Sequence, residues 1–248
     1  MQSNLPERLN HPDTTANRKA FIANKPFMHQ IYVEWYQLIK QHLPDLNGVM
    51  VELGSGPGFL DEEVPGVITS DLLFLPYLDA LMNGRYLPFM QNGVDSIMMV
   101  DVFHHISDAV AFFDEVNRVL KIGGRLIMIE PWMTPWSRWI YTRFHHEPVD
   151  MDVIDWKFKP SGPLTGANQA LPWVVFQRDR ERFEQRFPGL QIKKIQPIMP
   201  ITYLLGGGFA MRTSLPGFSY GVMRKLESRL IKPEKAGMFA LIVVEKVK

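Results

Sequence analysis

The chain has 248 residues, 46% of them hydrophobic and 21% charged, so it can bury a sizeable core and is not a disordered segment. A net charge of +1 argues against a nucleic-acid-binding protein, and a sequence without cysteine excludes disulfides and thiolate metal sites. The sequence has neither an apolar run of 18 residues nor a signal-peptide core, so we expect a cytoplasmic protein without a membrane-spanning helix.

The N-terminal part is predicted to be a loose segment followed by helix. Residues 1–17 are polar and are expected to be loose, whereas apolar side chains recur every three or four residues from Arg18 to Leu43. Pro26 is expected to divide this helical stretch, because proline removes a backbone hydrogen bond. We therefore expect residues 1–45 to form a helical lid.

Apolar runs then alternate with helical patterns, which is typical of a parallel sheet buried on both faces. The expected strands are Val49–Leu53, Val67–Ser70, Ser96–Val100 and Arg125–Ile129. The expected helices are Leu72–Met82 and Asp108–Leu120, the second ending at a cation and two glycines.

The second half of the chain has a less regular pattern. Residues 132–173 are rich in tryptophan, proline and histidine and show no clean period. A charged amphipathic helix is predicted over Gln177–Phe187, and the last two strands over Gln191–Pro197 and Met238–Val244. The stretch between these strands, Pro200–Tyr220, is a long insertion of the kind that is more often functional than idle.

A glycine-rich loop follows the first strand, in the sequence VELGSGPGFL. Gly54, Gly56 and Gly58 would let backbone approach a ligand at the carboxyl edge of the sheet. A dinucleotide site requires G-x-G-x-x-G, whereas the spacing here is G-x-G-x-G, so the loop suits a ligand that lacks a pyrophosphate. Asp71, at the end of the next strand, could accept hydrogen bonds from two ribose hydroxyls; the alternative is a structural turn aspartate.

The order ELGSGPG, LPF, HHI and LKIGGRLIMIEP resembles class I S-adenosylmethionine-dependent methyltransferases, in particular the type 11-like group. The resemblance implies a single α/β domain, with a Rossmann-like, seven-stranded, mostly parallel sheet, helices on both faces and an antiparallel last strand. It also implies S-adenosyl-L-methionine as cofactor. Residues 46–131 would form the cofactor-binding half, and residues 132–175 and 198–222 would be acceptor-side lid insertions.

The resemblance also implies roles for individual residues. The methionine part and the ribose would be surrounded by Glu52, Gly54, Ser55, Gly56 and Gly58, with Asp71 on the ribose hydroxyls. Leu72 would lie against adenine, and Asp101 and Val102 would border the methionine end. Asn83 stands where the family has an aspartate that accepts a bond from the adenine amino group; its amide oxygen can still accept, but the charge is lost.

Histidines are the candidate catalytic residues, because a weakly acidic acceptor needs a base near pH 7. His104 and His105 follow the strand Ser96–Val100 and are expected at the acceptor side, touching substrate or acting as base; the alternative is a helix cap or a structural loop histidine. His145 and His146, with Glu147, could belong to a lid, a metal site or a plain surface loop. Adjacent ligands rarely point to one ion, so no metal is expected. Glu130 is expected to face the same cleft.

Aromatic residues outside the shared core suggest an apolar or lipid-like small acceptor, or else a second small core. They are Trp132, Trp136, Trp139, Tyr141, Trp156, Trp173, Tyr203, Phe209, Phe218 and Tyr220. Cations among aromatics in SRWIYTRFHH also suggest peripheral membrane contact.

The predicted function is methyl transfer to a small-molecule acceptor, at oxygen, with nitrogen and carbon left open. The alternatives are a non-catalytic S-adenosylmethionine-binding partner or regulatory protein and an NAD-dependent oxidoreductase. The sequence leaves the oligomeric state open.

Overall fold

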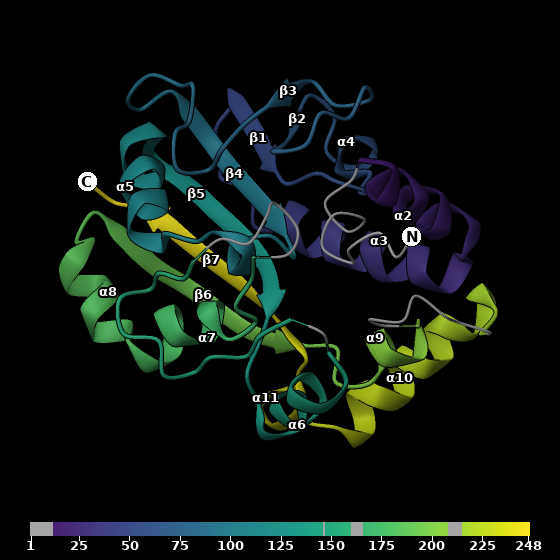
Figure 1. The fold of residues 1–248 in the computed structure, drawn as a ribbon. Helices are drawn as coiled ribbons and strands as arrows, with labels where there is room; N and C mark the ends of the chain where they lie inside the picture. The colour runs from purple at the N-terminus through teal and green to yellow at the C-terminus, as the bar shows by residue number, and fades with distance from the viewer. Residues whose placement is uncertain (1–11, 146, 160–165, 208–214) are drawn as a thin grey trace, which may run out of the picture.

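The computed structural model describes residues 12–145, 147–159, 166–207 and 215–248. Residues 1–11, His146 and Phe209, on which expectations were placed, lie outside these ranges. The chain forms a seven-stranded sheet in the order β3-β2-β1-β4-β5-β7-β6, with helices on both faces (Figure 1). The strands are β1 (Val49–Leu53), β2 (Ile68–Asp71), β3 (Ala80–Leu81), β4 (Val94–Val100), β5 (Leu120–Pro131), β6 (Leu190–Ile198) and β7 (Phe239–Lys246).

Strand direction confirms the predicted mixed sheet. The pairs from β3 through β5 are parallel, and β7 lies antiparallel between β5 and β6. Val51 of β1 lies in register with Ile68 of β2 on one side and Ile97 of β4 on the other. The strands that follow β1 in sequence therefore lie on both sides of it, β2 and β3 on one side and β4 and β5 on the other. This reversal of strand order is the switch point, where open α/β sheets bind ligands.

Two helices precede the sheet, α2 (Pro12–Asn24) and α3 (Pro26–Lys40). The break at Lys25 confirms the expected effect of Pro26. The expectation that residues 1–17 are loose is wrong for residues 12–17, because α2 already begins at Pro12.

The remaining helices follow the sheet strands. They are α4 (Leu60–Glu63), η1 (Phe103–His105), α5 (Ala109–Val119), α6 (Pro135–Phe144), α7 (Leu171–Trp173), the π-helical η2 (Val174–Arg178), α8 (Arg180–Arg186), α9 (Thr202–Leu205), η4 (Gly217–Ser219), α10 (Tyr220–Leu230) and α11 (Pro233–Ala236). Asp108 caps α5 by accepting a hydrogen bond from the Ala111 amide, as expected of an aspartate at this position.

The helix predicted over Leu72–Met82 is wrong. This stretch consists of turns that end in the short edge strand β3, which pairs with β2 through Ser70 and Ala80. Pro76 would remove a hydrogen bond from a helix here. Asp79 instead bonds the amide and hydroxyl of Thr69, so contacts with β2 outweigh the local helical pattern.

The core lies on both faces of the central strands. Trp35 of α3 packs on Phe239 of β7 with ring centroids 4.9 Å apart, and Phe113 of α5 packs on Phe183 of α8 at 5.0 Å. The segments α9 and η4 lie against α3, so the described parts of the long insertion pack on the N-terminal helices. Within the described residues, the structure contains no helix that is long and apolar enough to cross a membrane.

Candidate active site

A cavity of about 480 Å³ opens at the carboxyl ends of β1, β2 and β4. This volume lies within the range of small-molecule sites, about 300–1,000 Å³. Its walls come from α2 and α3, from the loops after these three strands, and from the segments that carry His145, Gln169 and Tyr203. The ligand-sized cavity therefore lies at the switch point of the sheet.

The glycine loop is fastened to the end of β2. The Gly56 amide donates to Asp71 Oδ2 at 3.1 Å, and the Ser55 amide donates to the Ser70 carbonyl at 2.8 Å. Gly54 has φ +71°, a backbone conformation that L side chains rarely adopt. Gly54 and Gly56 border the cavity, while Ser55 is buried and Gly58 lies against the Tyr36 hydroxyl.

The helix after this loop is short. It has four residues and begins at Leu60, so no long helix points its amides at the loop. A dinucleotide pyrophosphate depends on such a helix N-terminus. The NAD-dependent alternative therefore loses its structural basis.

Asp71 lies at the edge of the cavity. Its Oδ1 accepts from the Leu73 amide at 2.9 Å while Oδ2 holds Gly56, and burial raises the pKa of its carboxyl. The next residue, Leu72, is 55% exposed and lines the same cavity. A carboxylate and an apolar surface thus stand side by side, the pair of contacts that a nucleoside requires.

Glu52 lies beneath the loop and is not among the residues that border the cavity. It is only 2% exposed, and among the described residues its Oε2 has no hydrogen-bond partner. The pKa of this carboxyl is raised to about 7, because the effect of burial exceeds the lowering by the hydrogen bond to Ser55. A buried acid of this kind makes stability depend on pH near neutrality.

We expect Glu52→Gln to flatten that dependence. Because the pKa of Glu52 is about 7 in the folded chain against 4.5 ordinarily, folding favours the neutral acid. Its stabilising contribution is complete below the unfolded pKa and is lost as the pH rises through 7, by about 3 kcal/mol. Urea unfolding at about pH 5 and pH 8 measures this difference. The exposed Glu62→Gln variant is the control, and equal slopes in wild type and E52Q would contradict the prediction.

Asn83, Asp101 and Val102 all border the cavity. The Asn83 amide oxygen accepts from the Arg85 backbone amide at 3.0 Å. Asp101 has φ +61°, and its side chain is 43% exposed and borders the cavity. Desolvation within the cavity raises the pKa of its carboxyl to about 6. A non-glycine residue held in this conformation is uncommon and is concentrated at functional sites.

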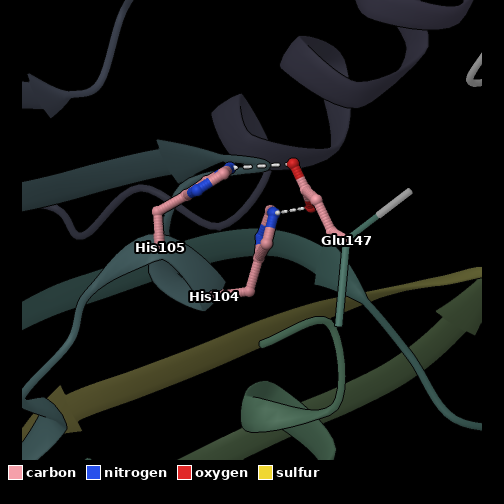
Figure 2. Close-up of side chains that lie close together, drawn as sticks. All are labelled: His104, His105 and Glu147. Atoms are coloured by element: carbon pink, nitrogen blue, oxygen red, sulfur yellow. Dashed lines mark ion pairs between the residues drawn. The ribbon is translucent and has the colours of Figure 1, made fainter. Parts of the chain in front are cut away.

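The structure distinguishes the two adjacent histidines (Figure 2). His105 borders the cavity, and its Nδ1–H donates to the Gly166 carbonyl at 3.1 Å. Burial lowers the pKa of His105 to about 3, so its ring is neutral and Nε2 keeps a lone pair. His104 does not border the cavity and is fully buried beneath it.

Two carboxylates hold His104. Its Nδ1 lies 2.9 Å from Glu130 Oε2, and its Nε2 lies 3.5 Å from Glu147 Oε2. Burial alone would lower the pKa of His104, but the bonds to Glu130 and Glu147 raise it well above its ordinary value. The same contact lowers the pKa of Glu147, against the effect of its burial. His104 is thus suited to positioning Glu147 rather than to taking a proton from a substrate.

Glu130 has a different place from the expected one. It is fully buried and is not among the residues that border the cavity. One of its oxygens accepts from the amides of Val102 and Phe103, at 2.8 and 2.6 Å. Glu130 therefore fixes the turn η1, which places His104 and His105.

The sequence did not single out several residues that border the cavity. They are Thr15, Arg18 and Ile22 of α2, Tyr32 of α3, and Arg85 and Gln169 from later segments. The apolar spacing of residues 18–43 predicted that helices form there. It did not predict which side chains of those helices would face the edge of the sheet.

Most aromatic residues expected around the acceptor lie elsewhere. Trp132, Tyr141 and Trp156 are buried in the core, whereas Tyr203 borders the cavity. The buried members belong to the same core cluster as the sheet rather than to a separate second core. Trp139 and Phe144 of α6 are exposed, and membrane contact through them stays a prediction.

Residues 69–128 match the family described as methyltransferase domain, from β2 into β5. A sequence search of curated proteins finds no match. Among solved structures, the chain is similar to geranyl diphosphate C-methyltransferase from Streptomyces coelicolor A3(2), with 15% identity, TM-score 0.51 and coverage of 93% of this chain and 84% of that one.

Two further structures are similar at low identity. One is described as geranyl diphosphate methyltransferase in complex with S-adenosylmethionine, with 12% identity, TM-score 0.52 and coverage of 92% and 90%. The other is an S-adenosylmethionine-dependent methyltransferase from Mesorhizobium loti, with 14% identity, TM-score 0.50 and coverage of 85% and 96%. Residues 69–128 thus match a methyltransferase domain, and the chain as a whole shares the fold of these S-adenosylmethionine-dependent methyltransferases.

Proposed function

We propose that this enzyme transfers the methyl group of S-adenosylmethionine to an oxygen atom of a small acceptor bound in the cavity. The observation that carries the proposal is the joining of the glycine loop to Asp71 at the cavity edge, through the Gly56 amide. This arrangement places glycine backbone and a carboxylate together at the edge of a cavity large enough for a nucleoside. The chemistry itself belongs to the sulfonium of the cofactor, and the chain binds and orients the reactants.

The cofactor would lie across the switch point of the sheet. Asp71 would accept bonds from the ribose hydroxyls, and Leu72 and Asn83 would border the adenine. Gly54, Asp101 and Val102 would surround the methionine end. Each of these residues would contribute binding contacts rather than a reacting group, in keeping with a site that positions its ligand.

The acceptor would lie beyond the methionine end, where the cavity wall is polar. His105, Glu147 and Gln169 border that part, together with the tyrosines Tyr32 and Tyr203. His105 Nε2 carries a lone pair that can take the proton of a hydroxyl as the methyl group arrives. This wall favours a small acceptor with a polar group over a purely apolar lipid.

Methyl transfer to carbon is a second candidate. Arg18 and Arg85 border the cavity, and two guanidinium groups suit an acceptor that carries an anionic group. Similar structures include enzymes named for geranyl diphosphate, an acceptor of that class. A panel that contains both phenols and prenyl diphosphates therefore separates the two candidates.

Calorimetry with S-adenosylhomocysteine tests the first step of the proposal. We expect one molecule to bind per chain, and turnover with radiolabelled S-adenosylmethionine to transfer label to a phenol or small alcohol. Label that enters only prenyl diphosphates would favour the carbon acceptor. A folded chain that binds no S-adenosylhomocysteine would contradict both.

We expect Asp71→Asn to weaken S-adenosylhomocysteine binding at least about tenfold, because hydrogen bonds to a charged group are stronger than neutral ones by roughly 1 kcal/mol. The amide also replaces one acceptor oxygen by a donor that faces the amide of Gly56 or Leu73. Asp61→Asn, at an exposed position of α4, is the matched control. Unchanged affinity in D71N would remove Asp71 from the proposed ribose site.

A further inference from the structure

Three side chains beside the cavity direct their polar atoms toward one another (Figure 2). His104, His105 and Glu147 each offer one atom, and these atoms lie within 4.8 Å of one another. The His104 and His105 rings are 4.2 Å apart between centroids, and both turn Nε2 toward the Glu147 carboxylate. The turn η1 thus directs two adjacent histidines toward the same carboxylate. In a regular strand, adjacent side chains would point to opposite faces.

A second layer of hydrogen bonds holds each of the three groups. His104 is bonded through Nδ1 to Glu130, and His105 donates its Nδ1–H to the Gly166 carbonyl. The Gln169 side-chain amide donates to Glu147 Oε2. Metal-binding histidines characteristically give their other nitrogen to a carboxylate or a backbone carbonyl, and ligating carboxylates are themselves hydrogen-bonded.

On the His105 side, the facing atoms suit a cation, whereas a metal at His104 would displace the Nε2 proton held toward Glu147, with Nδ1 still bonded to Glu130. A carbonyl only accepts, so the contact with Gly166 places the His105 proton on Nδ1. The neutral ring then directs a lone pair from Nε2 at Glu147 Oε1, 3.8 Å away. A cation bound between these two atoms would be attracted by both.

We propose that His104, His105 and Glu147 form a binding site for a divalent transition metal, with Zn²⁺ as the best match. Two imidazoles and one carboxylate are ligands that zinc accepts, and a catalytic zinc site keeps a further position open. The ligand atoms of a tetrahedral zinc lie about 3.3 Å apart, so the three groups would move together by about 1 Å. His105 and Glu147 border the cavity, so the open position faces it.

The position of the site suggests its use, and this step rests on the proposed function. With the metal bound, His105 Nε2 would be a ligand rather than the base. An acceptor hydroxyl bound to the metal would then lose its proton to water more readily, as metal-bound water does. Metal binding itself requires neither cofactor nor acceptor. It is therefore measured independently of methyl transfer.

The test uses the full chain without a histidine tag, stripped with a chelator and titrated with zinc chloride in a calorimeter. We expect one zinc ion per chain with micromolar or tighter affinity, and visible absorption on substitution with Co²⁺. His105→Ala and Glu147→Gln are each expected to weaken zinc binding at least about 100-fold, because each loses a direct ligand. His42→Ala, outside the cluster, is the matched control and should bind as wild type does.

Circular dichroism verifies that the variants are folded. Zinc binding that survives in both folded variants would overturn the proposal, because the metal would then sit elsewhere. The cobalt spectrum of the wild-type chain tests the proposal even where a variant fails to fold. The absence of a visible band at stoichiometric Co²⁺ would also overturn the proposal. Neither result bears on S-adenosylhomocysteine binding, which is measured without metal.

Discussion

Replacement of Glu130 by glutamine is expected to lower the free energy of unfolding by about 3–5 kcal/mol, because it breaks a buried, charged hydrogen-bond cluster. The Glu130 carboxylate is fully buried and accepts from the amides of Val102 and Phe103 and from His104 Nδ1. Glutamine has the same shape but turns one oxygen into a donor, which then faces donors. Urea unfolding monitored by circular dichroism measures the loss.

The control for Glu130 is Glu181→Gln on the exposed face of α8, which should change stability by no more than about 0.5 kcal/mol. A loss below about 1 kcal/mol in E130Q would show that the turn η1 holds its shape without the carboxylate. The predicted loss would instead identify Glu130 as the residue that positions both histidines.

Gly54→Ala is expected to weaken S-adenosylhomocysteine binding by about 100-fold, since strain and a steric clash of roughly 3 kcal/mol fall on the cofactor loop. An added Cβ would lie 2.4 Å from one methyl group of Val102 and 2.7 Å from the other. Val102 cannot retreat freely, because its amide donates to Glu130 at 2.8 Å. Calorimetry with S-adenosylhomocysteine measures the change.

Gly66→Ala separates strain from clash. Gly66 also has a positive φ, +85°, but a Cβ there would meet no atom within 4 Å. Its substitution should cost about 1–2 kcal/mol of stability and leave cofactor affinity unchanged. If both variants bound equally well, close approach at Gly54 would have no part in the site.

The strands and the cofactor loop could be predicted from sequence because their causes are local. Apolar runs marked β1, β2, β4 and β5, and the spacing of Gly54 and Gly56 indicated the loop. The stretch from Leu72 to Met82 could not be predicted in this way. Its local pattern favours a helix, and its turns depend on the pairing of Ser70 with Ala80 across two strands.

The roles of the histidines could not be assigned from sequence for a similar reason. His104 and His105 are neighbours with the same chemistry, and the structure separates them by contacts with Glu130, Glu147 and Gly166. Those partners lie 26, 43 and 61 residues away along the chain. No local pattern near the histidines encodes such distant contacts.

The place of β7 between β5 and β6 has a consequence for biosynthesis. β6 is made before β7, yet within the described sheet its ladder partner is β7 alone. On the ribosome, β6 must therefore wait as an unpaired segment until Phe239–Lys246 has emerged. The nascent chain is expected to be most exposed to aggregation and to need chaperones most during that interval.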